Sequence, residues 1–506
     1  MAATQLSWTH CSVTPKRAGA SVAQALQLVN PSTIPQLSGR FEPIGSEIKA
    51  DHLSVEGSLP SDLTGGYFRN GPNPRFTPLG SYTYPLEGDA MIHGLWLEGG
   101  KARYANRWVR TKGIAAEERA GHALYGGLMT PAFVDMALLG PDPDPGWPFR
   151  LDPFVNVVRH AGRYLALEEG TPPYEITAEL DTVGLFDFGG GLPSGLCAHP
   201  KIDPVTGEMI VFRYDVEEPF LTWAIIGPDG TVSRPPTTVD GVDAGFMIHD
   251  FAITEHYLVL TIGPAVFDLD AMLTGGSVLS WQPKLGTRIA VIPRDGSSGP
   301  MWIHTEAFWV WHFANAYELS SQTPASAPTD ELRIVLDFPW WNSPAFGLAG
   351  DAELIRGAFT RATLDPGRGS LSLDHLDGMG TEFPRIDDRL IGRHHRYLTV
   401  AGVSGRHELV QGEHDRLIRY DMDTGKSVAF DCDGVIGEVV FVPRSGGTEE
   451  LDGYYLTFAT SFGADRSAWA YLWDASEFPS APMAKVAIPQ RVPNGLHGNW
   501  FPPEAR

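Results

Sequence analysis

Short apolar runs, separated by turn residues, recur along the chain from Phe41 onward. In most of them apolar residues alternate with polar ones or fill the whole run, which is typical of half-buried or fully buried strands. Several are bounded by Pro-Asp-Gly (228–230) or Asp-Pro-x-Thr-Gly (203–207) turns, which are hairpin signals. The clearest runs are 65–71, 102–111, 163–169, 209–216, 256–263, 287–293, 332–338, 417–423 and 454–461. Strand-turn units without alternating helices predict an all-β fold.

The same pattern predicts one large domain behind a short arm. Residues 1–40 are rich in Ala, Ser, Gln and Thr with little periodicity, which predicts a loosely ordered N-terminal arm. No linker follows, so residues 41–506 are expected to form a single domain, because β-barrels and propellers can be long as one unit. Helical periodicity is confined to insertions such as 130–140. The 56 glycines and 41 prolines agree with many short elements.

Charge and composition exclude several classes of protein. With 38 basic and 61 acidic residues, the formal net charge is −23, which repels a phosphate backbone and disfavours nucleic-acid binding. No segment offers about 18 uninterrupted apolar residues, so no transmembrane segment is expected. Three cysteines without a CxxC pair indicate neither a disulfide framework nor a thiolate metal site. The first residues lack the apolar core of a secretory signal, which favours a cytoplasmic protein.

Four of the 16 histidines lie between apolar or small residues. They are His199, His249, His312 and His497. Such surroundings predict buried imidazoles, which need a hydrogen-bond partner or a metal ion. Each one alone is more often a core histidine, and the intervals between them match no local zinc motif. Four strands converging on a propeller axis would fit the same spacing.

Eight longer sequence motifs give information that the spacing of the histidines does not give. They are GGYFRNGPNP (65–74), EGDAMIHG (87–94), NRWVRT (106–111), AHPKIDPVTGE (198–208), MIHDFAIT (247–254), TEFPRID (381–387), GEVVFVPR (437–444) and LHGNW (496–500). Together, and in this order, they resemble the carotenoid cleavage oxygenase family, which includes the retinal-pigment isomerohydrolase and stilbene-cleaving dioxygenases. The resemblance extends from about Phe41 to Trp500.

The resemblance implies a seven-bladed β-propeller, with a cap of loops and short helices over a metal site on its axis. One Fe(II) ion would be held there by four histidines. Motif by motif, these are His199, His249, His312 and His497. Four neutral imidazoles leave the charge of the ion intact, and octahedral iron keeps positions for dioxygen or water. His93 and His256 are expected to be structural, and His394–His395 to be an exposed turn pair.

Three glutamates match the family's outer ligand sphere. The implied pairs are Glu169 with His249, Glu382 with His312, and Glu438 with His497. Such carboxylates accept the second N–H of a metal-bound imidazole and orient the ring. The alternative is that they are rim carboxylates, as most glutamates are. His199 has no glutamate partner in this scheme, and Glu168 is the alternative to its neighbour Glu169.

Residues beside the ligand motifs are expected to line the substrate cavity. They are Met247, Trp311 and Phe383, whose aromatic members suit a flat polyene or stilbene. Phe267 belongs to the apolar segment 266–281, which together with 130–140 could shape a tunnel mouth, dip into a membrane, or cap the domain's own core.

Three positions bear on the choice of substrate. Stilbene cleavers of the family grip a phenolic hydroxyl with a Tyr and a Lys, where this chain has Trp108 and His122. Glu168 stands where carotenoid cleavers have an aromatic residue. Trp108 is therefore expected to contact substrate, and a phenolic stilbene is disfavoured.

The function implied is an Fe(II)-dependent dioxygenase. It would use dioxygen to cleave one conjugated C=C bond of a carotenoid or apocarotenoid, a hydrophobic polyene, into two carbonyl products. Alternatives are a stilbene-cleaving dioxygenase, a retinoid-type isomerohydrolase, and a non-catalytic lipid-binding propeller. We expect a cytoplasmic protein that could contact a membrane peripherally.

Overall fold

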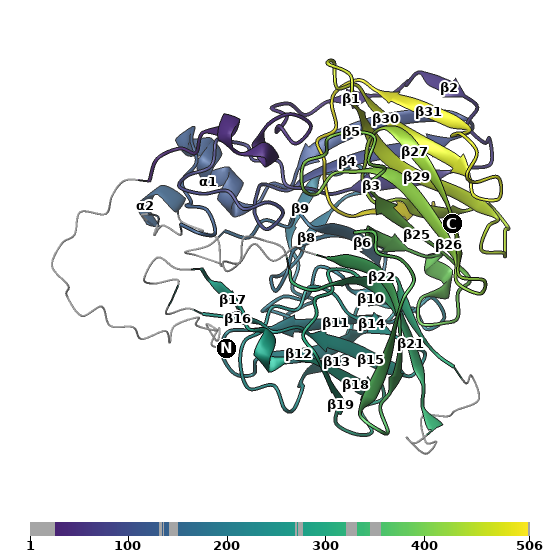
Figure 1. The fold of residues 1–506 in the computed structure, drawn as a ribbon. Coiled ribbons are helices and arrows are strands. Elements are labelled where there is room, and N and C mark those ends of the chain that lie inside the picture. Colours follow the sequence, from purple (N-terminus) through teal and green to yellow (C-terminus); the bar gives the residue numbers. More distant parts are fainter. Residues whose placement is uncertain are drawn as a thin grey trace.

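The computed structural model consists almost entirely of antiparallel β-sheets (Figure 1). It describes residues 26–130, 134, 136–140, 150–268, 271, 277–319, 331–344 and 356–503. Within these residues the helices are α1 (Lys112–Ala120), α2 (Met136–Leu139) and a few short 3-10 turns. The all-β part of the predicted fold is therefore confirmed, and each of the nine predicted runs overlaps a strand.

Four sheets of four strands follow one another along the chain. The first contains β6 (Asn156–His160), β7 (Arg163–Leu167), β8 (Tyr174–Ile176) and β9 (Thr182–Leu185). The second contains β10 (Lys201–Ile202), β11 (Met209–Tyr214), β12 (Leu221–Ile226) and β13 (Val232–Thr238). The third contains β14 (Ala252–Ile253), β15 (Tyr257–Ile262), β18 (Thr287–Pro293) and β19 (Met301–Thr305). The fourth contains β20 (Asn315–Glu318), β21 (Ile334–Trp341), β22 (Gly357–Asp365) and β23 (Ser370–His375). A hairpin of β16 (Ala265–Phe267) and β17 (Leu279–Trp281) is inserted in the third.

Two larger sheets combine strands from both ends of the chain. One has the order β1 (Lys49–Ala50), β5 (Lys101–Trp108), β4 (Met91–Glu98), β3 (Gly65–Arg69) and β32 (Gly498–Phe501). The other has the order β2 (Val55–Gly57), β31 (Ala484–Ile488), β30 (Ala468–Asp474), β29 (Gly453–Ser461), β27 (Lys426–Ile436), β26 (His414–Asp421), β25 (Tyr397–Gly402) and β24 (Glu382–Arg385), with β28 (Val440–Pro443) beside β29. Figure 1 shows the purple N-terminal strands among the yellow C-terminal ones.

The apolar faces of neighbouring sheets pack against each other. Tyr67 of β3 and Tyr104 of β5 are fully buried, and Phe458 of β29 lies against them, with its ring centroid 5.1 Å from that of Tyr67. Strand β15 is buried at every position, as expected for a strand covered on both faces. The cores therefore lie between the sheets, and the sheet ends are left to carry polar groups.

Part of the predicted arm packs on this body. Residues 1–25 lie outside the described part. Beyond them, Gln27 and Val29 form backbone hydrogen bonds with the segment around Gly80, and Arg40 forms an ion pair with Glu413. The predicted domain boundary at residue 40 stays a prediction.

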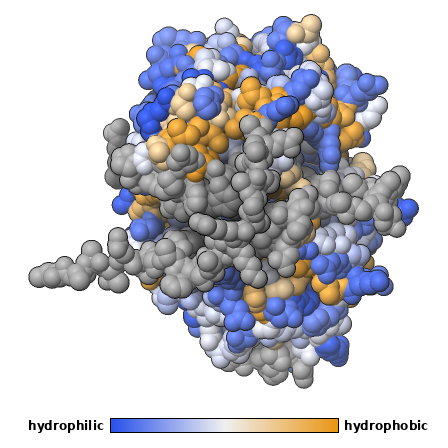
Figure 2. Space-filling view, turned by 90° about the vertical axis from the view of Figure 1, so that its left-hand side faces the viewer, coloured by the Kyte–Doolittle hydropathy of each residue, from blue (hydrophilic) through white to orange (hydrophobic). Residues whose placement is uncertain are grey.

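The face in Figure 2 is the side that carries α1 and α2 in Figure 1, and hydrophobic surface gathers in its upper half. Leu138 of α2 is 53% exposed, and Leu28 is 60% exposed. None of the helices in the described ranges is long and apolar enough to cross a bilayer. The expected peripheral membrane contact stays a prediction, and most of 130–140 lies outside the described residues.

Candidate metal centre

Four histidines converge at one point of the structure. Each one precedes a strand: His199 precedes β10, His249 precedes β14, His312 precedes β20, and His497 precedes β32. One nitrogen from each ring lies within 4.8 Å of the others. The Nε2 atom of His249 is 3.2 Å from the Nε2 atoms of both His199 and His312. All four rings are almost fully enclosed by the protein, so they form a compact group of nitrogen donors.

The outer nitrogens of three of these rings face carboxylates. His312 Nδ1 lies 2.7 Å from Glu382, His497 Nδ1 lies 3.1 Å from Glu438, and His249 Nδ1 contacts Glu169. These are the pairs that the motifs imply. In the described part of the chain, the His199 ring forms no hydrogen bond with a carboxylate. An Nδ1–H that donates to a carboxylate fixes the tautomer and leaves the Nε2 lone pair facing the centre.

Burial and neighbouring charges set the protonation of the group. Burial, together with the neighbouring imidazoles, holds the pKa of His199 and of His312 well below 6.5, so both rings are uncharged at neutral pH. Burial also acts to lower the pKa of His249, but the Glu169 carboxylate outweighs it and raises that pKa.

The two other carboxylates differ in their surroundings. Burial acts to raise the pKa of Glu438, but the Arg385 guanidinium and His497 outweigh it and lower that pKa to about 2. Burial raises the pKa of Glu382 to about 7, although it accepts a hydrogen bond from Trp341. Glu438 is therefore a firmly ionised acceptor, whereas Glu382 shares a proton more readily.

An irregular strand lets consecutive residues reach the same site. Side chains normally alternate between the faces of a strand, but β24 has a register shift between Glu382 and Arg385. Phe383 adopts a left-handed backbone with φ of 55°, which is uncommon for a residue with a side chain. As a result Glu382 contacts His312 while the Phe383 ring lies over the same imidazole, with centroids 5.5 Å apart. Such strained residues are typical of functional sites.

On one side of the four histidines lies a cavity of about 610 Å³ with a mainly apolar wall. Four of the predicted substrate-contacting residues line it: Met247, Trp311, Phe383 and Phe267. His249, His312 and His497 form part of the wall, so an apolar molecule in this cavity would lie beside the centre.

Trp108 and His122 do not line this cavity. Trp108 is 3% exposed, donates its indole N–H to the Asn73 carbonyl, and packs on Ile114. His122 is exposed, and its ring donates to the Ala123 carbonyl. Trp108 was expected to contact substrate because it stands where stilbene cleavers of the family grip a phenolic hydroxyl, but its side chain, at the end of β5, does not reach this cavity. These two positions therefore give no reason to exclude a phenolic stilbene from the cavity.

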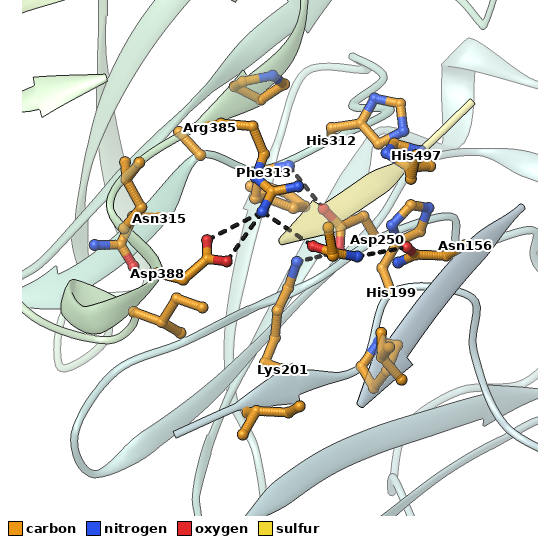
Figure 3. A pocket seen from close by; sticks show the side chains of 18 of the residues that line it. Asn156, His199, Lys201, Asp250, His312, Phe313, Asn315, Arg385, Asp388 and His497 are labelled. Carbon is orange, nitrogen blue, oxygen red and sulfur yellow. Dashed lines mark hydrogen bonds and ion pairs between the residues drawn. The ribbon is translucent and has the colours of Figure 1, made fainter. Parts of the chain in front are cut away.

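A second cavity, of about 630 Å³, lies beside His199, His312 and His497 and has several charged side chains in its wall (Figure 3). Its wall includes His199, the ion pair between Lys201 and Asp250 at 2.7 Å, and Arg385, which contacts Asp388. The centre thus has a mainly apolar cavity on one side and a cavity lined by charged side chains on another.

Three further residues of the apolar cavity were not predicted from the sequence. Tyr214, at the end of β11, donates its hydroxyl to Glu169. Trp341 donates its indole N–H to Glu382 over 2.6 Å. His414, at the start of β26, is 8% exposed. The sequence did contain a signal for His414: it precedes a predicted strand, as each of the four metal-ligand candidates does.

One expectation about the other histidines is wrong. His395 is completely buried, not exposed, because Asn315 donates a hydrogen bond to its Nδ1 and Asp337 lies 3.4 Å from its Nε2. Its neighbour His394 is exposed, with 58% of its side chain accessible. His93 contacts the Tyr104 hydroxyl at 2.7 Å, inside the core.

The sequence and the fold match known proteins over nearly their whole length. The model of the family described as Retinal pigment epithelial membrane protein matches residues 41–502. A carotenoid cleavage oxygenase of Mycobacterium tuberculosis is 34% identical, and the alignment covers 95% of this chain and 99% of that protein. The crystal structure of Pseudomonas brassicacearum lignostilbene dioxygenase is 27% identical, with a TM-score of 0.82 over 93% of this chain and 98% of that one. Cobalt-substituted Synechocystis apocarotenoid oxygenase is 27% identical, with a TM-score of 0.76 over 91% and 97%.

Proposed function

Because the chain belongs to the carotenoid cleavage oxygenase family, we propose that it is an Fe(II)-dependent dioxygenase that cleaves one conjugated C=C bond of a carotenoid or apocarotenoid into two carbonyl products. The observation that carries this proposal is the position of the four converging imidazoles in the wall of an apolar cavity of about 610 Å³. Relatives with names of carotenoid-cleaving oxygenases support the reaction class.

The donor set fits a metal ion such as iron. Two Nε2 atoms that lie 3.2 Å apart, each facing the other, repel through their lone pairs unless a proton or a cation lies between them. Imidazole nitrogens suit iron, copper, nickel and zinc, and a neutral donor set leaves the charge of the ion uncompensated. His199, His249, His312 and His497 would hold the ion. When bound, iron supplies the redox chemistry that brings dioxygen into reaction with an alkene.

The chain's own residues would perform the other tasks. Glu169, Glu382 and Glu438 orient three of the imidazoles through Nδ1. Trp311 and Phe383 hold a flat conjugated chain beside the centre and keep water from it. An enclosed apolar wall also protects reactive species from side reactions with solvent.

We also propose that the sheets are the blades of a seven-bladed propeller. The nine-stranded sheet would then be two blades that meet at β27 and β29, which pair over only Gly434–Ile436. Four of the remaining sheets have four strands each, in chain order, and the five-stranded sheet completes the set.

A second candidate is cleavage of an aryl alkene of the stilbene kind. The likeness to a lignostilbene dioxygenase favours it. The cavity also contains polar groups, including Glu168 and His414, which a bare hydrocarbon does not need.

The deciding experiment is aerobic incubation of the iron-loaded protein with carotenoids, apocarotenals and hydroxystilbenes, followed by mass analysis. We expect paired aldehydes, consumption of one dioxygen per cleavage, and one oxygen-18 atom in each product when labelled dioxygen is used. His312→Ala is the matched control. An isomerised alcohol formed without dioxygen consumption would indicate the isomerohydrolase reaction instead, and binding without turnover would indicate a lipid-binding protein.

A further inference from the structure

His414 is a buried histidine whose ring has no hydrogen-bond partner among the residues that the structure describes. Four histidines outside the metal candidates are buried in the described part of the chain. Three of them have a partner: His93 contacts Tyr104, His160 contacts the Gly207 carbonyl, and His395 accepts from Asn315. The fourth, His414, is 8% exposed, and its Nδ1 is buried without a partner. Neither of its ring nitrogens forms a hydrogen bond with a described residue.

An unpaired imidazole in the protein interior has a cost. Leaving a buried donor or acceptor unsatisfied costs about 1–3 kcal/mol, so such a group in a folded protein calls for a specific explanation. A phenylalanine at this position would pack on Phe383, whose ring centroid is 5.7 Å from that of His414, without this cost. Packing therefore does not explain the histidine.

The position of His414 points to a ligand. Its side chain lines the apolar cavity. The Phe383 ring lies 5.4 Å from His497 and 5.5 Å from His312, so His414 is separated from the four-histidine centre by one aromatic ring. An elongated molecule that lies over Phe383 with one bond beside the centre would bring a more distant atom to His414.

We propose that His414 binds an oxygen atom on the end group of the alkene substrate, so that the enzyme selects hydroxylated or carbonyl-bearing alkenes over bare hydrocarbons. This inference rests on the proposed function of the same cavity. A neutral imidazole carries one N–H donor and one acceptor nitrogen, so it can accept from a hydroxyl or donate to a carbonyl.

The surroundings select among oxygen-bearing groups. Burial lowers the pKa of His414 to about 4, so the ring is uncharged at neutral pH. The carboxylates Glu168, Glu169 and Glu382 line the same cavity, and the whole chain has a formal net charge of −23. A substrate carboxylate would be repelled there, whereas a neutral hydroxyl or carbonyl would not. Tyr84 and Gln36 add further polar atoms to the wall.

The first test compares substrates that differ only in the end-group oxygen. Suitable pairs are a 3-hydroxy-apocarotenal with its deoxy analogue, and 4-hydroxystilbene with stilbene. A hydrogen bond to a buried group of this kind corresponds to about a 10–100-fold preference in kcat/KM for the oxygenated member. His414→Phe should reduce this preference to about 2–3-fold or less, and His414→Gln, which keeps a donor and an acceptor, should retain part of it. His304→Phe changes an exposed histidine on β19 and should keep the wild-type preference.

A binding measurement separates this inference from the proposed function. Quenching of tryptophan fluorescence under anaerobic conditions, with Trp311 and Trp341 in the cavity wall, reports the affinity for each member of a pair without turnover. If the protein cleaves no alkene but binds the oxygenated member more tightly through His414, the proposed function fails and the inference stands. If the wild type cleaves or binds both members equally well, or if His414→Phe keeps the full preference, the inference is overturned. The preference of the wild-type protein for the oxygenated member of each pair tests the inference even if both His414 variants fail to fold.

Discussion

Glu438 is the carboxylate whose replacement should cost the protein most. Its Oε1 atom contacts His497 Nδ1 at 3.1 Å, and its Oε2 atom accepts from the Gly498 backbone N–H at 2.9 Å and from Arg385 at 3.1 Å. Only 4% of the side chain is accessible to solvent. In Glu438→Gln the new amide NH₂ must face at least one of these donors, and the guanidinium loses its buried counter-charge.

The magnitude follows from these contacts. Removing one partner of a buried ion pair costs about 3–5 kcal/mol. Arg385 keeps Asp388 at 3.0 Å, so we expect the lower end, about 3 kcal/mol. The lowering of the Glu438 pKa from 4.5 to about 2 leads independently to about 3 kcal/mol in favour of the ionised form.

Glu382→Gln is the matched control. Glu382 also contacts one of the four converging imidazoles, but its hydrogen-bond partners among the described residues are His312, Trp341 and the Phe383 N–H, with no guanidinium or ammonium group. Because burial raises its pKa to about 7, an uncharged group is already well tolerated there. We expect a loss of about 1 kcal/mol, typical of one exchanged hydrogen bond.

Urea unfolding of the metal-free proteins at pH 7, followed by tryptophan fluorescence, measures both losses. A titration of the folded variants with Fe(II) should show binding weakened about 10–100-fold in each. A stability loss in Glu382→Gln that equals or exceeds the loss in Glu438→Gln would refute the reasoning, because the two sites differ mainly in the guanidinium.

Three further predictions address the metal, pH and Trp108. His312→Ala should purify without iron and without activity, and full iron occupancy by elemental analysis would remove this residue from the ligand set. Burial lowers the pKa of His395 from 6.5 to about 3, so between these values the unfolded chain binds a proton that the folded chain does not, and stability is lost as pH falls. From pH 7 to pH 5 the free energy of unfolding should fall by about 2 kcal/mol. This loss should be absent in His395→Gln and present in His394→Gln. Identical pH profiles of unfolding in His395→Gln and wild type would contradict the prediction. Trp108→Phe should lose the hydrogen bond to the Asn73 carbonyl and about 1 kcal/mol of stability, with no change in product distribution. An altered product distribution would indicate that Trp108 contacts the substrate.

The sequence predicted most of the strands and the group of histidines, for different reasons. Strand periods are local, so Thr287–Pro293 could be assigned from its own residues. The convergence of His199, His249 and His497 could not be deduced from their spacing, because it depends on the order of whole sheets, and whole motifs were needed to find it. The motifs also indicated two of the carboxylate partners, since Glu382 and Glu438 each belong to a motif of their own, whereas Glu169 lies between two of the motifs.

The misplaced residues share one physical cause. Trp108 lies at the end of a strand, where the sequence does not determine which neighbours its side chain meets. His395 lies in a polar run that resembles a turn, but Asn315 and Asp337, far away in the sequence, enclose it. His414 follows a polar loop and nevertheless enters a cavity. Tertiary partners, not local pattern, decide burial at such positions.

The sharing of sheets between the two ends of the chain has a consequence for how the protein is made. Strand β3 pairs with β32, roughly 430 residues later, so this sheet depends on contacts of very high sequence separation. At a synthesis rate of about 5–20 residues per second, β3 leaves the ribosome some tens of seconds before its partner. Throughout that interval one edge of β3 is open, and His497, immediately ahead of β32, has yet to be added to the other three histidines. Closure of the fold and completion of the nitrogen donor set are therefore a single late event, and a nascent chain in the cell must be kept from pairing its open edge with another chain until then.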